Sequence, residues 1–519
     1  MTGSGFPRLL SPITIGGVPL RNRIVKAPQD THFVGPDGHV EERVIALYEA
    51  LARGGAGLII LASVPPIAMA PEAQQIAIWD DEFIPGLARV ADAVHRHGSK
   101  IFVQLNHGGP AEVDHFPHGR AWSASTLEAG ELPSPAPHFK PVRGLDPDEI
   151  AGVEEAYIQA AVRAHAAGYD GVEVHAAHTY MLACFLTRIW NRRTDEYGPQ
   201  TATTRTRIVT NIIQGIRARV GEDFPIGVRI NGREWGSPEA LTVTEAVENA
   251  RAIDALDIAY ISVTGYGHGP VPFKYVPDYW RYPEPQPDMV PFVGPAERKG
   301  LLIPAAGAIR EAVRAPVIGV GGLTPQKAER ALADGRADLV ALGRALWADH
   351  ELPNKIASGR VDEIRPCTRC ATCEVSPRKC RVNAALGGVE EYQLRSAEAP
   401  RRVIVVGGGP AGMEAARVAA IRGHAVTLYE KERSLGGMLP LAVTVKGTET
   451  EDILGYLDYL KRQLEILDVD VRLGVKSTPD DIRRESPEVV VVAVGGTYEV
   501  PAIPGMTNGL VTTTPALAK

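Results

Sequence analysis

Short apolar runs recur along the first 350 residues, and each one ends in glycine or polar residues. There are eight, at 24–28, 57–63, 101–105, 169–174, 225–230, 258–263, 316–320 and 338–342. Between several of them the apolar residues repeat with the period of a helix, as in 147–167, 202–220, 242–255 and 325–335. Strands that alternate with helices form parallel sheets. Eight such units predict a closed (β/α)₈ barrel, that is, a TIM barrel.

A second pattern begins near residue 400. The apolar run 403–406 leads into Gly407, Gly409 and Gly412 in the spacing G-x-G-x-x-G, and a helical segment follows. A second apolar run, 425–429, ends in Glu430. In this order the elements predict a Rossmann-like nucleotide-binding domain, with the diphosphate at the helix N-terminus and the ribose hydroxyls on Glu430.

Composition changes this picture little. A chain of 519 residues is long enough for two or three domains, and its hydrophobic content of 45% is ordinary for a globular protein. The net charge of -7 argues against a nucleic-acid or anionic-membrane partner. No apolar run reaches the roughly 20 residues of a membrane helix, and no secretory signal is visible, so a cytoplasmic protein is expected.

Four of the five cysteines lie close together in the sequence, at Cys367, Cys370, Cys373 and Cys380. In a cytoplasmic protein such a group indicates metal ligands rather than disulfides. Structural zinc more often uses two C-x₂-C pairs that lie further apart. Because Cys370 belongs to both C-x₂-C pairs, the spacing favours a 4Fe–4S cluster over zinc and over thiols without a metal.

The ends of the predicted barrel strands carry polar residues, and active sites of TIM barrels lie at this face. Gln104 offers a donor and an acceptor to a ring with an amide edge, and Arg229 offers fixed positive charge to an electron-rich ring. Gly321–Gly322 and Gly343–Arg344 follow strands seven and eight. Glycine lets backbone N–H groups approach a phosphate, and the Arg344 guanidinium adds a bidentate contact.

Strand four is followed by the pattern H-x-x-H-x-Y, formed by His175, His178 and Tyr180. A single histidine in a barrel loop is usually a structural residue. Three groups that exchange protons at one strand end favour catalysis instead.

Beyond these patterns, the stretches "VQLNHGG", "AGYDGVEVHAAHTYMLACFLTRIWNRRTDEYG" and "ADLVALGRALWADHELPNK" resemble the FMN barrel of the old yellow enzyme family. The resemblance covers most of residues 7–358. It implies that FMN is held by Ala27, Pro28, Gln29, Gln104, Arg229, Gly322, Gly343 and Arg344.

The resemblance also implies a reaction, the transfer of a hydride from reduced flavin to the β-carbon of an activated alkene. Imidazole N–H groups of His175 and His178 would stabilise charge on the activating carbonyl, and Tyr180 would protonate the α-carbon. In the bacterial 2,4-dienoyl-CoA reductases a histidine after strand six acts with the tyrosine. His268 is the candidate for that role here.

Longer members of this family, including 2,4-dienoyl-CoA reductase and trimethylamine dehydrogenase, carry a 4Fe–4S cluster after the barrel. The segments "RPC" and "CRVNAALGGVEEY" resemble the two ends of their cluster segment, although the gaps between the cysteines are shorter here. Gly437 resembles part of a second glycine pair of members that bind FAD or ADP. The resemblance thus implies FMN, a 4Fe–4S cluster, FAD or ADP, and NAD(P)H.

Three regions are therefore predicted: an FMN-binding barrel at 1–358, a cluster segment at 359–396 and an incomplete Rossmann-like domain at 397–519. No further glycine fingerprint for NAD(P)H follows, so a partner subunit that carries this domain is one expectation, beside a homo-oligomer. The leading functional hypothesis is reduction of the activated C=C bond of an α,β-unsaturated carbonyl compound or of an enoyl or dienoyl thioester, with NAD(P)H as the ultimate electron donor. The alternatives are an amine or N-methyl dehydrogenase and an electron-transferring subunit of a larger complex.

Overall fold

The computed structural model describes residues 5–70, 74–111, 120–132, 140–268, 300–370, 372–374, 377–387, 394–446, 451–496 and 504. The chain divides into two compact units. The first comprises Met1–Gly359 and Thr372–Val389, and the second comprises Arg360–Ala371 and Glu390–Lys519. The predicted cysteine segment is thus shared between the two units.

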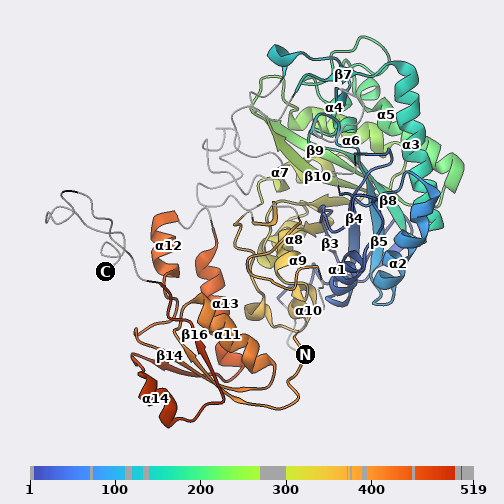
Figure 1. Ribbon diagram of the computed structural model, residues 1–519. Helices are drawn as coiled ribbons and strands as arrows, with labels where there is room; N and C mark the ends of the chain where they lie inside the picture. The colour runs from blue at the N-terminus through green and yellow to red at the C-terminus, as the bar shows by residue number, and fades with distance from the viewer. Residues whose placement is uncertain are drawn as a thin grey trace. The chain divides into compact units, whose positions relative to one another are not determined.

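The first unit is built around a closed barrel of parallel strands (Figure 1). Its eight strands follow one another in the order β10-β11-β12-β3-β4-β5-β8-β9. These are the eight strands that the apolar runs predicted: β3 (Ile24–Lys26), β4 (Leu58–Val64), β5 (Lys100–Leu105), β8 (Gly171–Ala176), β9 (Ile226–Trp235), β10 (Tyr260–Gly267), β11 (Val317–Gly319) and β12 (Leu339–Leu342). The end of strand five was predicted wrongly. β9 and β10 remain paired as far as Trp235 and Gly267, so Arg229 lies inside β9 rather than at its end.

Helices surround the barrel: α1 (Glu42–Arg53), α2 (Ile84–His95), α3 (Pro147–Ala166), α4 (Met181–Leu186), α5 (Ala202–Val220), α6 (Val243–Asp254), α7 (Ile303–Arg310), α8 (Pro325–Ala333), α9 (Arg344–Ala348) and α10 (Leu352–Ala357). Local sequence defines where the longer helices begin. The Asp146 side chain accepts a hydrogen bond from the Glu149 N–H ahead of α3, and Thr242 and Glu245 form the equivalent capping box ahead of α6.

An antiparallel hairpin, β1 (Ile13–Ile15) and β2 (Val18–Leu20), precedes the barrel. Its Ile15 and Leu20 share one apolar core with barrel residues such as Val25, Phe102 and Ile318. The loop after β5 adds a short parallel pair, β6 (Trp122–Ser123) and β7 (Arg143–Gly144). Single-turn helices lie at η2 (Asp81–Phe83), η4 (Ala129–Glu131), η6 (Val361–Glu363) and η7 (Thr372–Glu374).

The second unit contains a parallel sheet in the order β15-β14-β13-β16. Its strands are β13 (Arg402–Val406), β14 (Ala425–Glu430), β15 (Asp470–Leu473) and β16 (Val489–Val492), and its helices are α11 (Pro410–Ile421), α12 (Leu439–Lys446), α13 (Ile453–Ile466) and α14 (Pro479–Arg484). The strand, glycine loop and helix predicted from the G-x-G-x-x-G spacing are therefore present. Side chains of β13, β14, α11 and α13 form its core. Within the described part of the chain, no helix is long and apolar enough to cross a membrane.

Candidate active site

The ring side chains predicted to be catalytic lie together. His175 belongs to β8, His178 lies in the turn that follows, and Tyr180 is the residue that precedes α4. The ring centroids of His175 lie 5.0 Å from both His178 and Tyr180, and those of His178 and Tyr180 lie 5.5 Å apart. The turn places His178 at φ 60°, in the left-handed region that residues other than glycine rarely adopt.

Burial determines the charge of the two imidazoles. His175 is 3% exposed and His178 is 9% exposed. Burial holds the pKa of His175 well below 6.5, and the neighbouring His178 and the Arg229 guanidinium lower it further. Burial and Arg229 act on the pKa of His178 in the same direction. Both imidazoles are therefore neutral at pH 7, and each can donate a hydrogen bond without carrying a charge.

Arg229 and Gln104, both predicted to contact a flavin, are buried residues of the barrel strands β9 and β5. The Arg229 side chain is buried, and its Nη1 donates to Ser262 Oγ at 3.3 Å. Its Nε has no hydrogen-bond partner among the described residues, which leaves a donor for a ligand. Gln104 Nε2 donates to Glu173 Oε1 at 2.6 Å, and this bond orients the amide. A ring with amide edges, such as that of FMN, fits this donor set.

The residues predicted to hold a phosphate lie on neighbouring strands, since β11, β12 and β3 are adjacent in the barrel. Gly321 and Gly322 follow β11 with φ 119° and 63°, a conformation that favours glycine. A Cβ atom on Gly343 would lie 2.8 Å from Gln29 Oε1. The Gln29 side chain therefore lies directly against the Gly343 backbone, where a larger residue would not fit. Binding of a phosphate by Ala27, Pro28, Gln29 and Arg344 stays a prediction.

The sequence interpretation missed Lys26 in this group. Lys26 ends β3, is 2% exposed, and donates from Nζ to the Ala27 carbonyl and to Gln29 Oε1. Burial, assisted by Arg229, lowers its pKa to about 7. The sequence signal that could have marked Lys26 as a candidate is a lysine at the end of an otherwise apolar strand, because buried lysines are rare.

His268 follows β10 directly and is joined to Glu234, a second residue that sequence reasoning missed. His268 Nε2 lies 3.1 Å from Glu234 Oε2, and both side chains are inaccessible to solvent, with 0% and 1% exposure. Glu234 also accepts from Asn231, whose amide bonds to the backbone of His178. Because β9 continues past Arg229, Asn231 and Glu234 both lie on this strand, on either side of a register shift in its pairing with β10.

The nucleotide site predicted in the second unit consists mainly of backbone. Gly407 and Gly437 adopt φ 109° and 53°, and a Cβ atom on Gly412 would lie 1.8 Å from the Gly407 carbonyl oxygen. A Cβ atom on Gly437 would lie 2.9 Å from the Cα atom of Gly409. Only glycine permits these approaches, which leave backbone N–H groups open to a diphosphate.

Glu430 lies at the predicted position, at the end of β14. Its Oε2 accepts from the Gly408 N–H at 2.6 Å and its Oε1 from the Glu432 N–H at 2.8 Å. The carboxylate thus supports the glycine loop in this structure, and its contact with a ribose stays a prediction.

The four cysteines are divided between the units. Cys367 and Cys370 belong to the second unit, and Cys373 and Cys380 belong to the first. The Arg369 N–H donates to Cys367 Sγ at 3.4 Å, a bond that stabilises a thiolate, the form that binds iron. Among the residues with described positions, no three His, Cys, Asp or Glu side chains form a metal-binding group. The cluster therefore stays a proposal.

Within the first unit, the cysteine segment contacts the loop that follows β3. Arg378 donates from Nε to the Asp30 carbonyl at 3.1 Å and from its backbone N–H to the Thr31 carbonyl at 3.2 Å. Arg378 thereby links the region of Cys380 to the loop that begins with the predicted FMN residues Ala27–Gln29.

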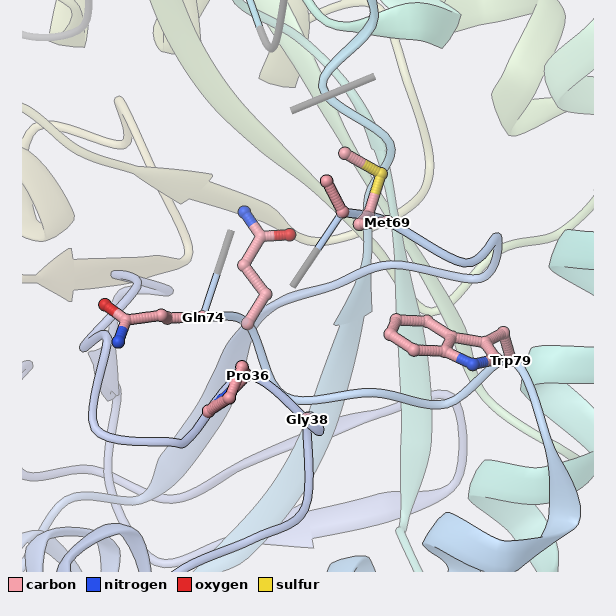
Figure 2. A pocket seen from close by; sticks show the side chains of 7 residues that line it. Pro36, Gly38, Met69, Gln74 and Trp79 are labelled. Atoms are coloured by element: carbon pink, nitrogen blue, oxygen red, sulfur yellow. The ribbon is translucent and has the colours of Figure 1, made fainter. Parts of the chain in front are cut away.

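One small cavity lies between the loops that follow β3 and β4 (Figure 2). It is lined by Pro36, Gly38, Met69, Ala70, Gln74, Gln75 and Trp79. Its volume of about 10 Å³ is enough for about one water molecule. Neither a flavin nor a substrate fits there, and none of the predicted site residues lines it.

Comparison with known proteins relates this geometry to a family. The family described as NADH:flavin oxidoreductase / NADH oxidase matches residues 8–363, which include the whole barrel. The chain belongs to this family. It is therefore an oxidoreductase and a flavoprotein with an FMN-type barrel. The family described as FAD dependent oxidoreductase matches residues 402–464, from β13 through most of α13.

Relatives of this family member differ in the reactions that they are named for. A NADH oxidase of Thermoanaerobacter brockii is 35% identical over 517 residues, which cover 96% of this chain and 74% of the relative. A cinnamate reductase of Clostridium sporogenes is 34% identical, with 96% and 75% covered. An N,N-dimethylglycine/sarcosine dehydrogenase of Chromohalobacter salexigens is 33% identical, with 95% and 70% covered.

Among solved structures, 2-naphthoyl-CoA reductase in complex with 2-naphthoyl-CoA superposes with a TM-score of 0.87 at 29% identity. The match covers 99% of this chain and 77% of that chain. The similarity thus extends over both units of the family member described here.

Proposed function

We propose that this NADH:flavin oxidoreductase reduces the activated C=C bond of an α,β-unsaturated carbonyl compound or an enoyl thioester, with NAD(P)H as the ultimate electron donor. The observation that supports the proposal is the pair of buried, neutral imidazoles of His175 and His178 beside the Tyr180 phenol. The relatives named cinnamate reductase and 2-naphthoyl-CoA reductase agree with it.

When bound, FMN supplies the hydride that is transferred to the β-carbon of the alkene. His175 and His178 donate N–H hydrogen bonds to the activating carbonyl oxygen, where negative charge develops. Their depressed pKa values make the imidazoles poor proton donors at pH 7. Tyr180 is therefore assigned as the acid that gives its proton to the α-carbon and regains one from solvent.

Electron supply through the cysteine segment forms part of the proposal. Cys367, Cys370, Cys373 and Cys380 would hold a 4Fe–4S cluster, which exchanges electrons one at a time. The second unit would bind FAD or ADP at Gly407, Gly409, Gly412, Glu430 and Gly437. A direct measurement of mass would test two further parts of the proposal. One is a complex with a partner subunit that binds NAD(P)H, and the other is a homo-oligomer.

The decisive experiment is anaerobic single turnover. Enzyme with reduced flavin is mixed with cyclohexenone, and the recovery of the oxidised flavin absorbance is followed. Tyr180→Phe is expected to slow this recovery by about a hundredfold or more, because general acid catalysis is lost. Recovery at the wild-type rate in Tyr180→Phe would contradict the assignment of Tyr180 as the acid. A wild type that shows no recovery would contradict the proposed alkene reduction.

The second candidate is oxidation of an N-methyl amine, which the relative named N,N-dimethylglycine/sarcosine dehydrogenase favours. Anaerobic addition of sarcosine to the oxidised protein distinguishes the two reactions. Bleaching of the flavin by sarcosine, with no reoxidation by cyclohexenone, would establish the amine reaction.

A further inference from the structure

Glu234 lies at the centre of a buried hydrogen-bond network that none of the predicted roles uses. Its Oε1 accepts from Asn231 Nδ2 at 2.8 Å. Its Oε2 lies within hydrogen-bond distance of Thr187 Oγ1 at 3.0 Å, His268 Nε2 at 3.1 Å and the Leu241 N–H at 3.3 Å. A carboxylate with 1% side-chain exposure accepts at both oxygens, and hydrogen bonds to the charged form keep it ionised.

Asn231 connects this carboxylate to the His178 turn. The Asn231 Oδ1 atom accepts from the His178 N–H, and its Nδ2 donates to the His178 carbonyl, both at 2.8 Å. One amide thus holds both backbone groups of a residue in the left-handed region. Glu234 favours the same orientation of the amide as the His178 backbone does, because a carboxylate oxygen accepts from Nδ2 and repels Oδ1.

His268 lies on the other side of the carboxylate. A carboxylate accepts only, so the proton of a neutral His268 imidazole is held on Nε2. Its buried Nδ1 has no hydrogen-bond partner among the described residues. The Tyr266 ring lies near both histidines, with its centroid 4.8 Å from that of His268 and 6.5 Å from that of His178.

We propose that Glu234 is a positioning residue that sets the orientation of the His178 turn through Asn231 and, independently, the tautomer of His268. The inference deepens the proposed function and rests on it for the identity of the reaction. Glu234 touches neither FMN nor substrate in this assignment. It acts by presenting two hydrogen-bond groups of the site in the geometry that the reaction uses.

The chemistry of glutamine makes Glu234→Gln a sharp test. Glutamine has one oxygen, so it can serve Asn231 or the Thr187–His268–Leu241 side, but not both. Three donors face the Oε2 position and one faces Oε1. The glutamine oxygen is therefore expected on the His268 side, which sets its NH₂ group against Asn231 Nδ2 and disturbs the His178 turn.

The experiment uses the full chain with its flavin, labelled with ¹³C at the histidine rings, and requires no substrate. Histidine resonances are assigned with His178→Gln and His268→Gln. Glu234→Gln is expected to shift the His178 resonance, whereas His268→Gln leaves it in place. Asp254→Asn is the matched control, because Asp254 is also buried but accepts from the Arg314 and Ala315 N–H groups. It is expected to shift neither resonance.

A second readout is the rate at which cyclohexenone reoxidises the reduced enzyme. Glu234→Gln is expected to lower the limiting rate by tenfold or more, as for residues that orient active groups, with a smaller change in the half-saturating concentration. An unchanged His178 resonance in Glu234→Gln would overturn the inference. A wild type that cyclohexenone does not reoxidise, with the expected shifts present, would overturn only the proposed reaction.

Should Glu234→Gln fail to fold, Asn231→Ser carries the test. It removes the amide between Glu234 and His178 and leaves His268 in contact with the carboxylate. The His178 resonance is expected to shift while the His268 resonance stays in place. An unchanged His178 resonance in this variant would overturn the role of the network.

Discussion

The two units place their predicted sites at the carboxyl ends of parallel strands, yet they build them from different parts of the chain. In the barrel, the predicted site consists of buried side chains, among them His175, His178 and Arg229. In the second unit it consists of glycine backbone at Gly407 and Gly409, with Glu430 as its polar side chain. The function of a site made of buried side chains depends on which of those side chains are protonated. A site made of backbone depends instead on the space that glycine leaves for a ligand.

The same contrast appears in how each sheet is covered. Barrel strands such as β8 are buried at every residue. In β16 of the second unit the side chains alternate, and Val490 and Val492 are 43% and 70% exposed. Low dielectric surroundings strengthen every charge interaction in the barrel, and this explains why its pKa values depart so far from ordinary ones.

The largest expected effect tests whether the predicted nucleotide site of the second unit depends on the space left by its glycines. Gly412→Val would place side-chain atoms against the Gly407 carbonyl oxygen, and the helix and strand would be forced apart. We expect a loss of about 3 kcal/mol in the stability of the second unit and loss of its FAD or ADP. Flavin and adenine contents measured after denaturation should show FMN retained.

The control for this change is Gly496→Ala, since a Cβ atom at Gly496 meets nothing within 4 Å. It should leave the nucleotide content unchanged. Equal loss of FMN and of the second nucleotide in Gly412→Val would show that the two sites are not independent.

The second effect tests whether the barrel depends on protonation. His107 follows β5, is 1% exposed, and has its pKa lowered to about 4 by burial. Below pH 6.5 the unfolded chain takes up a proton that the folded barrel refuses, so stability is lost as pH falls toward 4. Between pH 7 and pH 5 this amounts to about 2 kcal/mol for His107 alone.

Denaturant unfolding of the wild type and of His107→Gln at pH 7 and pH 5 measures how much of the stability lost on acidification is due to His107. The variant should lose about 2 kcal/mol less stability on acidification than the wild type does. Unfolding of the second unit, monitored through the release of its nucleotide, supplies an internal reference. Equal acid sensitivity in both proteins would contradict the assignment of a neutral, buried His107.

The smallest effect compares one local motif in the two units. Thr242 ahead of α6 and Thr478 ahead of α14 both form capping boxes, with Glu245 and Asp481. Thr242→Ala and Thr478→Ala should each cost about 1 kcal/mol of helix stability. Because α6 packs on the barrel and α14 has no buried residue, we expect only Thr242→Ala to lower the unfolding midpoint of its unit.

Much of the fold was predictable because local pattern and tertiary structure agree. All eight barrel strands follow from apolar runs that end in glycine or polar residues, and α5 spans the predicted 202–220. The ends of β9 and β10 were missed, since polar residues such as Asn231 and Arg233 end an apolar run while the backbone pairing continues. Pairing depends on the neighbouring strand, which no local pattern describes.

The sequence by itself determined which chemical groups the protein has and where each lies along the chain: H-x-x-H-x-Y after one strand, glycines after others, four close cysteines. Only the tertiary structure decided their states. It made His175 and His178 neutral, buried Lys26 beside Gln29, and joined His178 and His268 through Asn231 and Glu234. The physical reason is that protonation and hydrogen bonding depend on burial and on neighbours distant in sequence, and these exist only once the barrel has closed.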